Sequence, residues 1–388
     1  MAGGVVRDLL AGHPVRDVDL VVEADAAGFS RELAGSLAAA ARPHDRFGTA
    51  VLTLPGGDRL DVAAARREAY ASPGALPTVT LPATIAEDLA RRDFTVNAMA
   101  LELSPGRRLV DPYGGVRDLA RGTLRVLHPA SFADDPTRAL RAVRYANRYG
   151  FRPDSQTRRA LARAVETGAF DGVSGDRLRR ELVKIFSEPG RAAAVGLLRR
   201  LGLDAAIAPP LAKATGEAAR RRLRRVEALA RAEPLAGWLA YLLAWAGELG
   251  PADLGRLADR LGLAGSERAR LLGWPATRRR LGRGLARLRV SEIARRIGGL
   301  SPDELLAASA RMPAPDRRAL RIARRRIDRG GPSLRGADLI AAGVAPGEAI
   351  GRALSRTRDA ILDGRITPRE ALAFALRLAE KSAAGARG

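Results

Sequence analysis

Cysteine is absent from this sequence of 388 residues, which excludes disulfides, thiolate metal sites and thiol nucleophiles. The histidines, His13, His44 and His128, lack the spacing of an imidazole-based metal site. No apolar run approaches the roughly 20 residues of a membrane span. The N-terminus also lacks the basic and then apolar pattern of a secretory signal. We therefore expect a cytoplasmic protein that does not enter a membrane.

Lysine is nearly absent as well: only three of the 66 basic residues are lysines, and the others are arginines. The formal net charge is nevertheless +23, with a pI near 11.5. Such an excess points to a polyanionic partner, with RNA or DNA as the leading candidate. A GC-rich coding sequence accounts for the choice of arginine over lysine, but not for the surplus of bases over acids. Aromatic residues make up only 4% of the chain, so stacking on single-stranded bases is not the expected mode of binding.

The pattern of apolar residues changes near residue 130, and the length suits about two to four packed units. Before that point, short apolar runs at 20–22, 50–54, 60–63 and 96–103 predict strands, and residues 27–41 predict a helix. After it, strand signals nearly vanish. The fold class is therefore α+β, with a small mixed head followed by an all-helical extension. The further helices are predicted at 154–167, 176–187, 190–200, 215–231, 234–247, 251–262, 265–273, 291–298, 302–310, 314–328, 346–362 and 367–381.

Two aspartates, Asp17 and Asp19, stand two residues apart where an apolar run begins. On a β-strand this spacing sends both carboxylates to the same face. Adjacent carboxylates suit Mg²⁺, and two such ions activate an attacking hydroxyl and stabilise a leaving pyrophosphate. Asp61, in a second apolar run, is a candidate supporting ligand. An Asp-x-Asp pair by itself is more often a solvated turn than a metal site.

Gly3 and Gly4 open a helical pattern upstream of these aspartates. Backbone amides at such a turn approach a triphosphate closely, and Arg7 adds a charge-assisted contact. The plain alternative is a turn that only starts a helix. No glycine precedes any of the three lysines, which excludes a Walker-type phosphate loop.

A further helix is predicted to begin at Asp135 and Pro136, an acidic N-cap followed by proline. Apolar residues then recur at intervals of three and four, which defines one buried face. Arg138, Arg141 and Arg144 form an inclined ridge beside that face. Exposed arginines are common on solvated helices, so charge alone does not assign these three a function.

Six blocks in the first half of the chain together resemble the signature of class II tRNA nucleotidyltransferases and bacterial poly(A) polymerases, in the DNA polymerase β-like superfamily. The first reads Gly-Gly-Val-Val-Arg-Asp and the second Asp-Val-Asp. The last reads Asp-Asp-Pro-Thr-Arg-Ala-Leu-Arg-Ala-Val-Arg-Tyr. A chance match to all of them is negligible. In order, the blocks occupy residues 3–8, 17–19, 61–70, 88–100, 111–115 and 134–145.

The resemblance implies a nucleotidyltransferase head at 1–127, a base-recognising helical neck at 128–190 and a tRNA-binding helical body and tail at 191–388. It implies a template-independent enzyme that adds C, A or both to a tRNA 3′ end from CTP and ATP, with Mg²⁺ as cofactor. Shape and backbone recognition suits the acceptor and TΨC arm of a folded tRNA. The phosphates would be held, in a salt-sensitive way, by arginine-rich stretches at 219–225, 277–289 and 317–329.

The same resemblance carries catalytic roles onto Asp17, Asp19 and Asp61. It implies that Asp135 accepts from the exocyclic amine of cytosine or adenine while Arg138 donates to a ring acceptor. Uracil and guanine present a carbonyl oxygen instead, which the carboxylate repels. The implied nucleotide-binding residues are Gly3, Gly4, Arg7, Arg92, Asp135, Arg138, Arg141 and Arg144. A salt bridge between Arg92 and Asp93 is the structural alternative for Arg92, and a packing role is favoured for the helix at 176–184.

Several alternatives stay open at this stage. Segment 46–52 resembles tRNA nucleotidyltransferases more than poly(A) polymerases, whereas the loop at 70–87 does not match that of a full CCA enzyme. An enzyme that adds only CC or only A is therefore possible, as is a catalytically inert RNA-binding relative. The family has a strand before the glycine turn, where this sequence has only Met1 and Ala2, so either translation starts upstream or the head lacks an edge strand. The oligomeric state is not determined.

Overall fold

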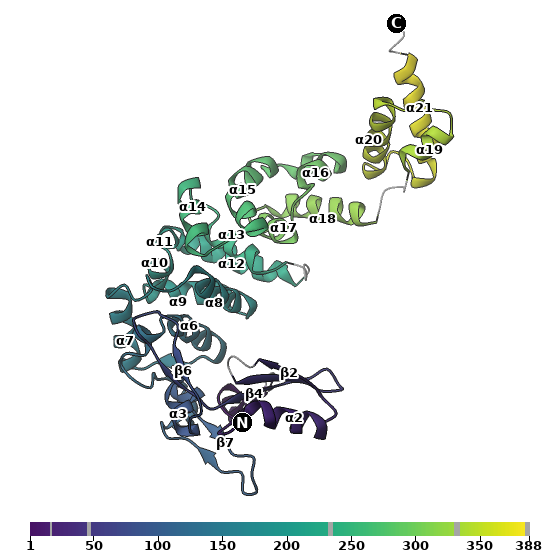
Figure 1. The fold of residues 1–388 in the computed structure, drawn as a ribbon. Coiled ribbons are helices and arrows are strands. Elements are labelled where there is room, and N and C mark those ends of the chain that lie inside the picture. The colour runs from purple at the N-terminus through teal and green to yellow at the C-terminus, as the bar shows by residue number, and fades with distance from the viewer. Residues whose placement is uncertain (16–17, 45–47, 232–235, 330–333, 385–388) are drawn as a thin grey trace. The chain divides into compact units, whose positions relative to one another are not determined.

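The computed structural model describes residues 1–388 except 16–17, 45–47, 232–235, 330–333 and 385–388. The chain forms two compact units, and Figure 1 shows its elements. Unit 1 comprises Met1–Arg220 with Gly255–Ala264, and unit 2 comprises Arg221–Leu254 with Gly265–Gly388. None of the helices in the described part combines the length and apolar character that crossing a bilayer requires. The predicted head, neck and body are defined by their functions rather than by packing, so that division stays a prediction.

A four-stranded mixed sheet forms the centre of the head. Its strands, in spatial order, are β1 (Val18–Val22), β4 (Arg59–Ala64), β3 (Thr49–Thr53) and β2 (Ala40–His44). β1 and β4 are parallel and the other pairs are antiparallel. Leu20 and Val62 pack in the core with helix α2 (Ala26–Ser36). Because side chains alternate along a strand, Asp19 and Asp61 emerge on the opposite face.

The rest of the head surrounds this sheet with short elements. Ala2 lies beside β1, where its backbone N–H donates to the carbonyl oxygen of Asp19 at 3.1 Å. This contact places the glycine turn directly beside the acid-bearing strand. The remaining elements are α1 (Gly4–Leu10), β5 (Arg67–Ala69), β6 (Thr78–Thr80), α3 (Ile85–Ala90), the 3₁₀ helix η2 (Thr95–Asn97), β7 (Ala100–Leu101), β8 (Leu109–Val110), α4 (Gly115–Ala120) and β9 (Thr123–Leu124).

Two local predictions in the head are wrong in part. The helix predicted over 27–41 ends at Ser36, and the chain then enters β2, because pairing with β3 outweighs the helix propensity of the alanines. The strand predicted over 96–103 begins instead as η2 and becomes extended only at Ala100. In this tight turn, Asn97 Nδ2 donates to Asp93 Oδ1 at 2.8 Å.

Beyond the head, the regular elements in the described residues are helices apart from β10 (Arg152–Pro153), which pairs with β9. This confirms the predicted fold class. Residues 234 and 235 of one predicted helix lie outside the described residues. Unit 1 continues with α5 (Ser131–Asp134), α6 (Thr137–Tyr149), α7 (Ser155–Glu166), α8 (Gly175–Ser187), α9 (Arg191–Arg200), α10 (Leu203–Ile207) and α11 (Pro209–Ala214), and the boundary between the units crosses α12 (Glu217–Ala230) and α14 (Pro251–Arg260).

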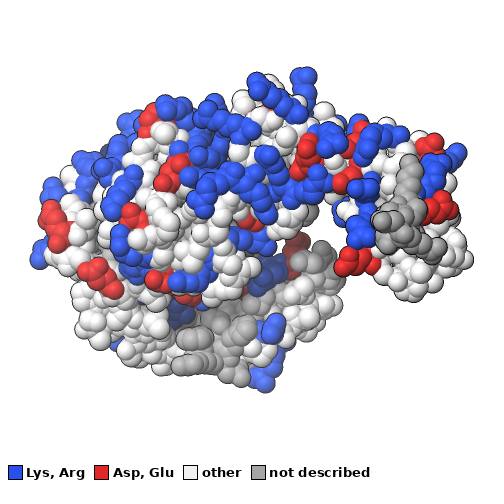
Figure 2. All heavy atoms as spheres, turned by 90° about the horizontal axis from the view of Figure 1, so that it is seen from above, with Lys and Arg blue, Asp and Glu red and all other residues white. Residues whose placement is uncertain are grey.

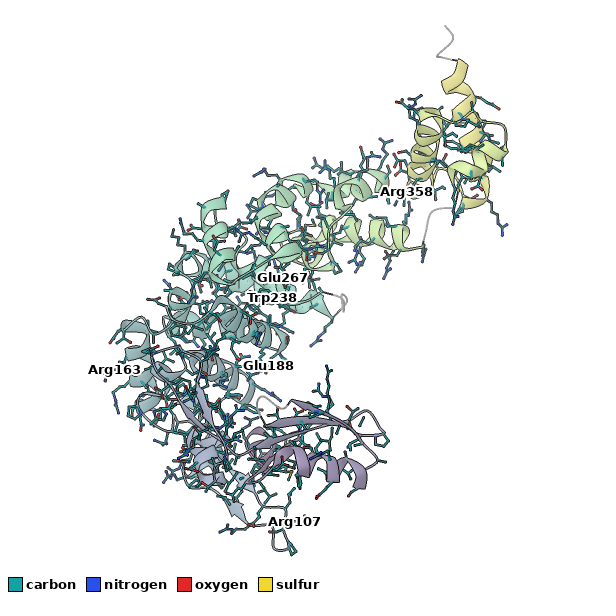
Figure 3. The ribbon with its side chains drawn as sticks, viewed as in Figure 1. Arg107, Arg163, Glu188, Trp238, Glu267 and Arg358 are labelled. Carbon is teal, nitrogen blue, oxygen red and sulfur yellow. The ribbon has the colours of Figure 1, made fainter. Side chains whose placement is uncertain are left out.

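Unit 2 is built around α13 (Trp238–Ala246), whose residues after Trp238 are all buried. The indole Nε1 of Trp238 donates to Glu267 Oε1 at 2.9 Å (Figure 3), which ties α13 to α15. A second cluster in unit 2 contains Leu339, Ile350 and Ala375. The other elements of unit 2 are α15 (Gly265–Leu281), η3 (Leu285–Arg287), α16 (Val290–Ile297), α17 (Pro302–Ser309), α18 (Ala314–Asp328), α19 (Gly336–Ala341), α20 (Glu348–Leu362), η4 (Pro368–Glu370) and α21 (Ala371–Ala384).

Candidate active site

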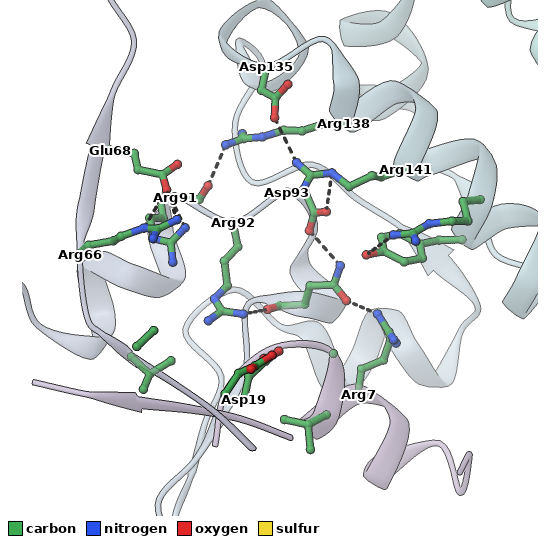
Figure 4. Close-up of a pocket in the computed structure, with 18 of the residues that line it drawn as sticks. Arg7, Asp19, Arg66, Glu68, Arg91, Arg92, Asp93, Asp135, Arg138 and Arg141 are labelled. Atoms are coloured by element: carbon green, nitrogen blue, oxygen red, sulfur yellow. Dashed lines mark hydrogen bonds and ion pairs between the residues drawn. The ribbon is translucent and has the colours of Figure 1, made fainter. Parts of the chain in front are cut away.

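A cleft in unit 1 collects side chains from α1, β1, β4, α6, α8 and the segments between them (Figure 4). Its volume is about 640 Å³, which is within the usual range for small-molecule sites. Among the described residues, nine arginines and six acidic residues line it. The surplus of cations favours an anionic ligand.

The acids of the sheet form one end of the cleft. Asp19 on β1 and Asp61 on β4 are partners in the parallel register, and both line the cleft. Asp61 Oδ1 is buried and has no hydrogen-bond partner in the described part of the chain, and its nearest cation is Arg59 at 3.9 Å. A buried carboxylate oxygen without a donor suits a cation as ligand. Asp17 lies outside the described residues, and those described contain no cluster of three or more metal-ligating side chains.

The glycine turn lies against these acids. Gly3 has φ of +88°, and a side chain there would collide with the guanidinium of Arg92. The Gly3 N–H donates to the carbonyl oxygen of Met99 at 2.9 Å, so this amide serves the fold. Gly4, where α1 begins, lines the cleft itself. Of the two glycines, only Gly4 is thus placed to face a ligand.

Arg7 is 4% exposed and is held on several sides. It pairs with Asp8, donating from Nε to Oδ1 at 2.9 Å and from Nη2 to Oδ2 at 3.0 Å. Its Nη2 also donates to the Tyr149 hydroxyl at 2.6 Å, and its Nη1 donates to Asn97 Oδ1. Burial alone would lower the pKa of Arg7, but the adjacent tyrosines and Asp8 raise it above its ordinary value. Arg7 is therefore a fixed cation in the wall of the cleft.

Asp93 connects η2 to α6. Its Oδ1 accepts from Asn97, and its Oδ2 lies 3.4 Å from Arg141 Nε. Burial would raise the pKa of Asp93, but Arg141 and the hydrogen bonds outweigh it and lower the pKa. Burial likewise opposes the charge of Arg141, whose pKa is raised by Asp93 and Asp135. The buried charges thus stabilise one another across the middle of the cleft.

In the part of the chain that the structure describes, Arg92 pairs with Asp88 rather than with Asp93, which does not favour the structural alternative of an Arg92–Asp93 salt bridge. Arg92 Nη2 contacts Asp88 Oδ2 at 2.9 Å, while Arg91 Nη2 contacts the other oxygen at 2.7 Å. Burial would raise the pKa of Asp88, but Arg92 and Arg91 outweigh it and lower the pKa. Because Arg92 and Asp93 are adjacent, the turn sends their side chains to different partners.

The ridge on α6 faces the cleft. Asp135 accepts at 3.0 Å from the backbone N–H of Thr137, the first residue of α6, whereas the N-cap position is Pro136, one residue after the predicted one. Arg138 is only 2% exposed, and its Nη2 donates to the carbonyl oxygen of Arg91 at 2.8 Å. Arg144 lies farther along, 3.9 Å from Glu188. The Nε atoms of Arg138, Arg141 and Arg144 are buried without a hydrogen-bond partner in the described residues, an unusual state for a purely structural ridge.

Sequence reasoning missed several residues that line the cleft. Arg66 and Tyr70 surround the buried carboxylate of Glu68, and all three residues line the cleft. Arg66 contacts Glu68 Oε1 at 2.9 Å, and the Tyr70 hydroxyl donates to Oε2 at 2.9 Å. Their spacing of two residues along an extended segment was the signal that would have placed them on one face. Arg177 on α8 also lines the cleft, although its helix was predicted to serve packing.

Comparison with known proteins agrees with this geometry. Residues 1–125 match the family described as "Poly A polymerase head domain", and residues 150–215 match "Probable RNA and SrmB- binding site of polymerase A". A solved "CCA-adding enzyme apo form II" is 31% identical with a TM-score of 0.81, and the match covers 99% of this chain and 91% of that one. The chain belongs to the class II CCA-adding and A-adding tRNA nucleotidyltransferase family.

Other members of this nucleotidyltransferase family extend the comparison. An A-adding tRNA nucleotidyltransferase of Geobacter sulfurreducens is 33% identical over 98% of this chain and 45% of its own length. One from Halalkalibacterium halodurans is 45% identical over 48% of this chain and 45% of its own length. This chain thus spans less than half of either curated relative. A Thermotoga maritima CCA-adding enzyme, solved with tRNA, is 29% identical, covering 99% and 90% of the chains, with a TM-score of 0.74.

The cleft is divided along its length. Figure 4 shows Asp19 at one end and Asp135 at the other, with Arg92, Asp93 and Arg141 between them. The acids at the first end suit metal ions, the arginines suit phosphates, and the pair of Asp135 and Arg138 suits the polar edge of a base. The acids, the arginines and the Asp135–Arg138 pair thus follow one another along the cleft in the order in which the reactive phosphates and the base follow one another in a nucleotide.

Proposed function

We propose that this chain is a template-independent nucleotidyltransferase that adds C, A or both to the 3′ end of tRNA from CTP and ATP. The supporting observation is the single cleft in which the acids of β1 and β4 and the Asp135–Arg138 pair flank a row of arginines. In this proposal Gly4, Arg7, Arg92, Arg141 and Arg144 surround the triphosphate. The RNA 3′-hydroxyl attacks the α-phosphorus, the new phosphodiester forms, and pyrophosphate leaves.

Mg²⁺ is part of this proposal, with Asp17 and Asp19 as ligands and Asp61 in support. The unpartnered Oδ1 of Asp61, beside Asp19 in register, fits a hard cation. Bound Mg²⁺ would supply charge neutralisation at both the attacking and leaving oxygens. The strand pairing keeps the carboxylates of Asp19 and Asp61 in place without reorganisation.

Base choice is proposed to rest on Asp135 and Arg138. The carboxylate of Asp135 accepts from an exocyclic amine, which cytosine and adenine share, and opposes the carbonyl oxygen of uracil or guanine. Arg138 is fixed by its donations to Ser131 Oγ at 2.9 Å and to the carbonyl oxygen of Arg91. A fixed donor beside a fixed acceptor recognises a base edge without a template strand.

The tRNA is proposed to bind through basic surfaces that include those of unit 2. Figure 2 shows basic side chains outnumbering acidic ones on the face that it displays. A pocket of about 320 Å³ at the end of α15 is lined by four arginines and, in the described part of the chain, by no acid. A groove of about 460 Å³ along α18 carries five more arginines. Both features suit RNA phosphates.

The test is extension of defined RNAs. A tRNA lacking its terminal CCA, a tRNA ending in CC and an unstructured RNA are each incubated with CTP or ATP, and the products are sized. We expect extension of at least one tRNA and none of the unstructured RNA. Extension of unstructured RNA into long tails would support a poly(A) polymerase instead, and binding without pyrophosphate release would support an inert relative.

Addition of a single terminal A is the second candidate. The likeness to A-adding enzymes over both the whole chain and its N-terminal half favours it. In that case only the tRNA ending in CC is extended, by one residue, with ATP. The matching outcome for a CC-adding enzyme is extension of the shorter tRNA with CTP alone. We place the reaction in the cytoplasm, where tRNA and nucleoside triphosphates meet.

A further inference from the structure

Arg177 on α8 bridges two parts of the cleft that are far apart in the sequence. Its Nη2 donates to Asp135 Oδ1 at 2.8 Å, and its Nη1 donates to the carbonyl oxygen of Gly74 at 2.6 Å. The Arg177 side chain is 19% exposed. A planar guanidinium with diverging donors holds both partners at once, which a lysine cannot do.

The two oxygens of Asp135 are used unequally. Besides Arg177, Oδ1 accepts from the Thr137 backbone N–H at 3.0 Å and from the Thr137 hydroxyl at 2.5 Å. In the described residues, Oδ2 accepts only from Arg141 Nη2, at 3.2 Å. Because a carboxylate oxygen offers about two lone pairs, Oδ1 is saturated and Oδ2 retains acceptor capacity. Arg177 and Thr137 together therefore hold Oδ1, and Oδ2 is the oxygen that remains available to a base.

Gly74 is fixed as firmly as Asp135. Its φ is +74°, and an added Cβ would lie 3.1 Å from the carbonyl carbon of Gly172. The Gly74 N–H donates to the carbonyl oxygen of Ala133 at 3.2 Å, so its amide is held on one side and its carbonyl by Arg177 on the other. Tyr70 and Pro77, on either side of this glycine, both line the cleft.

We propose that Arg177 is a positioning residue that sets base selectivity by locking the carboxylate of Asp135 and the segment around Gly74 in one arrangement. The inference rests on the proposed nucleotidyltransferase function. With Arg177 in place, one acceptor oxygen meets the exocyclic amine of C or A and opposes the carbonyl of U or G. Without it, the Asp135 carboxylate turns away from an opposing carbonyl, and the penalty against the wrong base falls.

The test compares Arg177→Met with a matched control, Arg180→Met. Arg180 lies on the same helix, its side chain is 71% exposed, and it pairs with Asp176 rather than with the cleft. The ratio of kcat/KM for the preferred nucleotide to that for UTP or GTP is measured for each variant on a tRNA substrate. We expect the ratio to fall about 10- to 100-fold in Arg177→Met, the size of one lost charge-assisted hydrogen bond. The kcat at saturating preferred nucleotide stays within a few fold, and Arg180→Met matches the parent.

An unchanged ratio in Arg177→Met overturns the proposal, as does an equal loss of rate with all four nucleotides. Arg177→Lys is expected to recover part of the ratio, since a lysine reaches one partner but not both. Gly74→Ala leaves Arg177 intact and should lower the ratio in the same direction. If thermal melting shows that Arg177→Met does not fold, the ratio measured for Gly74→Ala replaces it as the test.

A failure of the proposed function is distinguishable from a failure of this inference. If the parent protein extends no RNA, the function is wrong. Equilibrium binding of ATP, CTP, GTP and UTP to the parent and to Arg177→Met still measures base preference directly. A base preference that is stronger in Arg177→Met than in the parent, or one that is unchanged, would contradict the role of Arg177 whatever the outcome for catalysis.

Discussion

The arginines in the cleft of unit 1 and those on α18 of unit 2 carry the same charge in opposite surroundings. In the cleft, Arg138 is 2% exposed and Arg141 lies between two acids. On α18, Arg318 and Arg325 are exposed, and in the described residues Asp328 is the one acid that lines their groove. The first group is held by neighbouring acids and carbonyl oxygens, whereas Arg318 and Arg325 in the second group are exposed side chains.

This difference shows how one side chain serves two kinds of recognition. A guanidinium whose donors are aimed by carboxylates and carbonyls discriminates by geometry, and its charge is little screened by salt. An exposed guanidinium attracts any phosphate within reach, and its contribution declines as salt rises. We therefore expect variants in unit 1 to change chemistry, stability and base choice, and variants in unit 2 to change RNA affinity.

The largest expected effect separates chemistry from binding. Asp19→Asn removes a proposed metal ligand from the acid end of the cleft, and we expect extension to slow by about 1,000-fold because several kcal/mol of charge stabilisation are lost. Affinity for tRNA should stay within a few fold of the parent. Single-turnover extension and equilibrium RNA binding measure the two quantities. An Asp19→Asn variant that extends tRNA at the parent's rate would exclude the proposed metal role.

The second prediction concerns stability. Asp93→Asn leaves the partly buried Arg141 with Asp135 as its remaining acid, and losing one hydrogen bond to a charged group costs about 1.5–3 kcal/mol. We expect a lower Tm by calorimetry. Removing one charge, of opposite sign, from an exposed arginine of α18, as in Arg325→Ser, should leave Tm within about 1–2 °C, since surface substitutions rarely exceed about 0.5 kcal/mol.

The same acid predicts how stability depends on pH. The pKa of Asp93 is lowered in the folded protein, so the unfolded chain binds the proton more readily. Its contribution is therefore complete above the unfolded pKa of about 3.9 and is lost as the pH falls through the lower folded value. Asp88 acts in the same direction. Asp93→Asn should consequently lose less stability than the parent on acidification, and an equal loss would contradict this account.

The third prediction concerns base choice. Asp135→Ala removes the proposed acceptor, and we expect discrimination against UTP and GTP to fall by about 100-fold, the effect of a lost specific hydrogen bond on a buried site. Metal binding should change much less, because Asp19 lies at the other end of the cleft, with Asp61 opposite it in the parallel register. Kinetics with each nucleotide and titration with Mg²⁺ or Mn²⁺ provide the two measurements. Unchanged discrimination would count against Asp135 as a base reader.

The smallest expected effect lies in unit 2. The double variant Arg318→Ser/Arg325→Ser should weaken tRNA binding by about tenfold and lower the slope of log affinity against log salt by about 1.5. Base selectivity should not change. The matched control is Arg159→Ser/Arg163→Ser, which removes two exposed arginines of α7. Equal losses in both variants would mean that net charge, rather than the α18 groove, drives binding.

Much of the cleft was predictable because its residues form local patterns. The signals at Asp19 and at Asp135 are readable over a few residues, and both residues line the cleft, while Asp17 lies outside the described residues. Asp61 was predicted as a supporting acid, and the parallel register places it beside Asp19. The roles assigned to these residues await the experiments above.

Other parts were not predictable because they depend on contacts between distant segments. Nothing near Arg177 in the sequence indicates that it reaches both Asp135 and Gly74, more than 40 and 100 residues away. Contacts over such separations leave no short-range signal in the sequence. The pairing of Arg92 with Asp88 is a different case, because it spans four residues at the end of α3 and is a local helix pair that the sequence analysis overlooked.

By itself, the sequence determined the family, the α+β head with its helical extension, and the presence of an acid pair, a glycine turn and an arginine ridge. These features arise from residue type, order and periodicity, which are properties of short segments. Only the tertiary structure decided which arginine meets which acid, and so which donors and acceptors stay available to a ligand. The physical reason is that buried charges are stable only when paired, and the pairing is settled by how strands and helices pack.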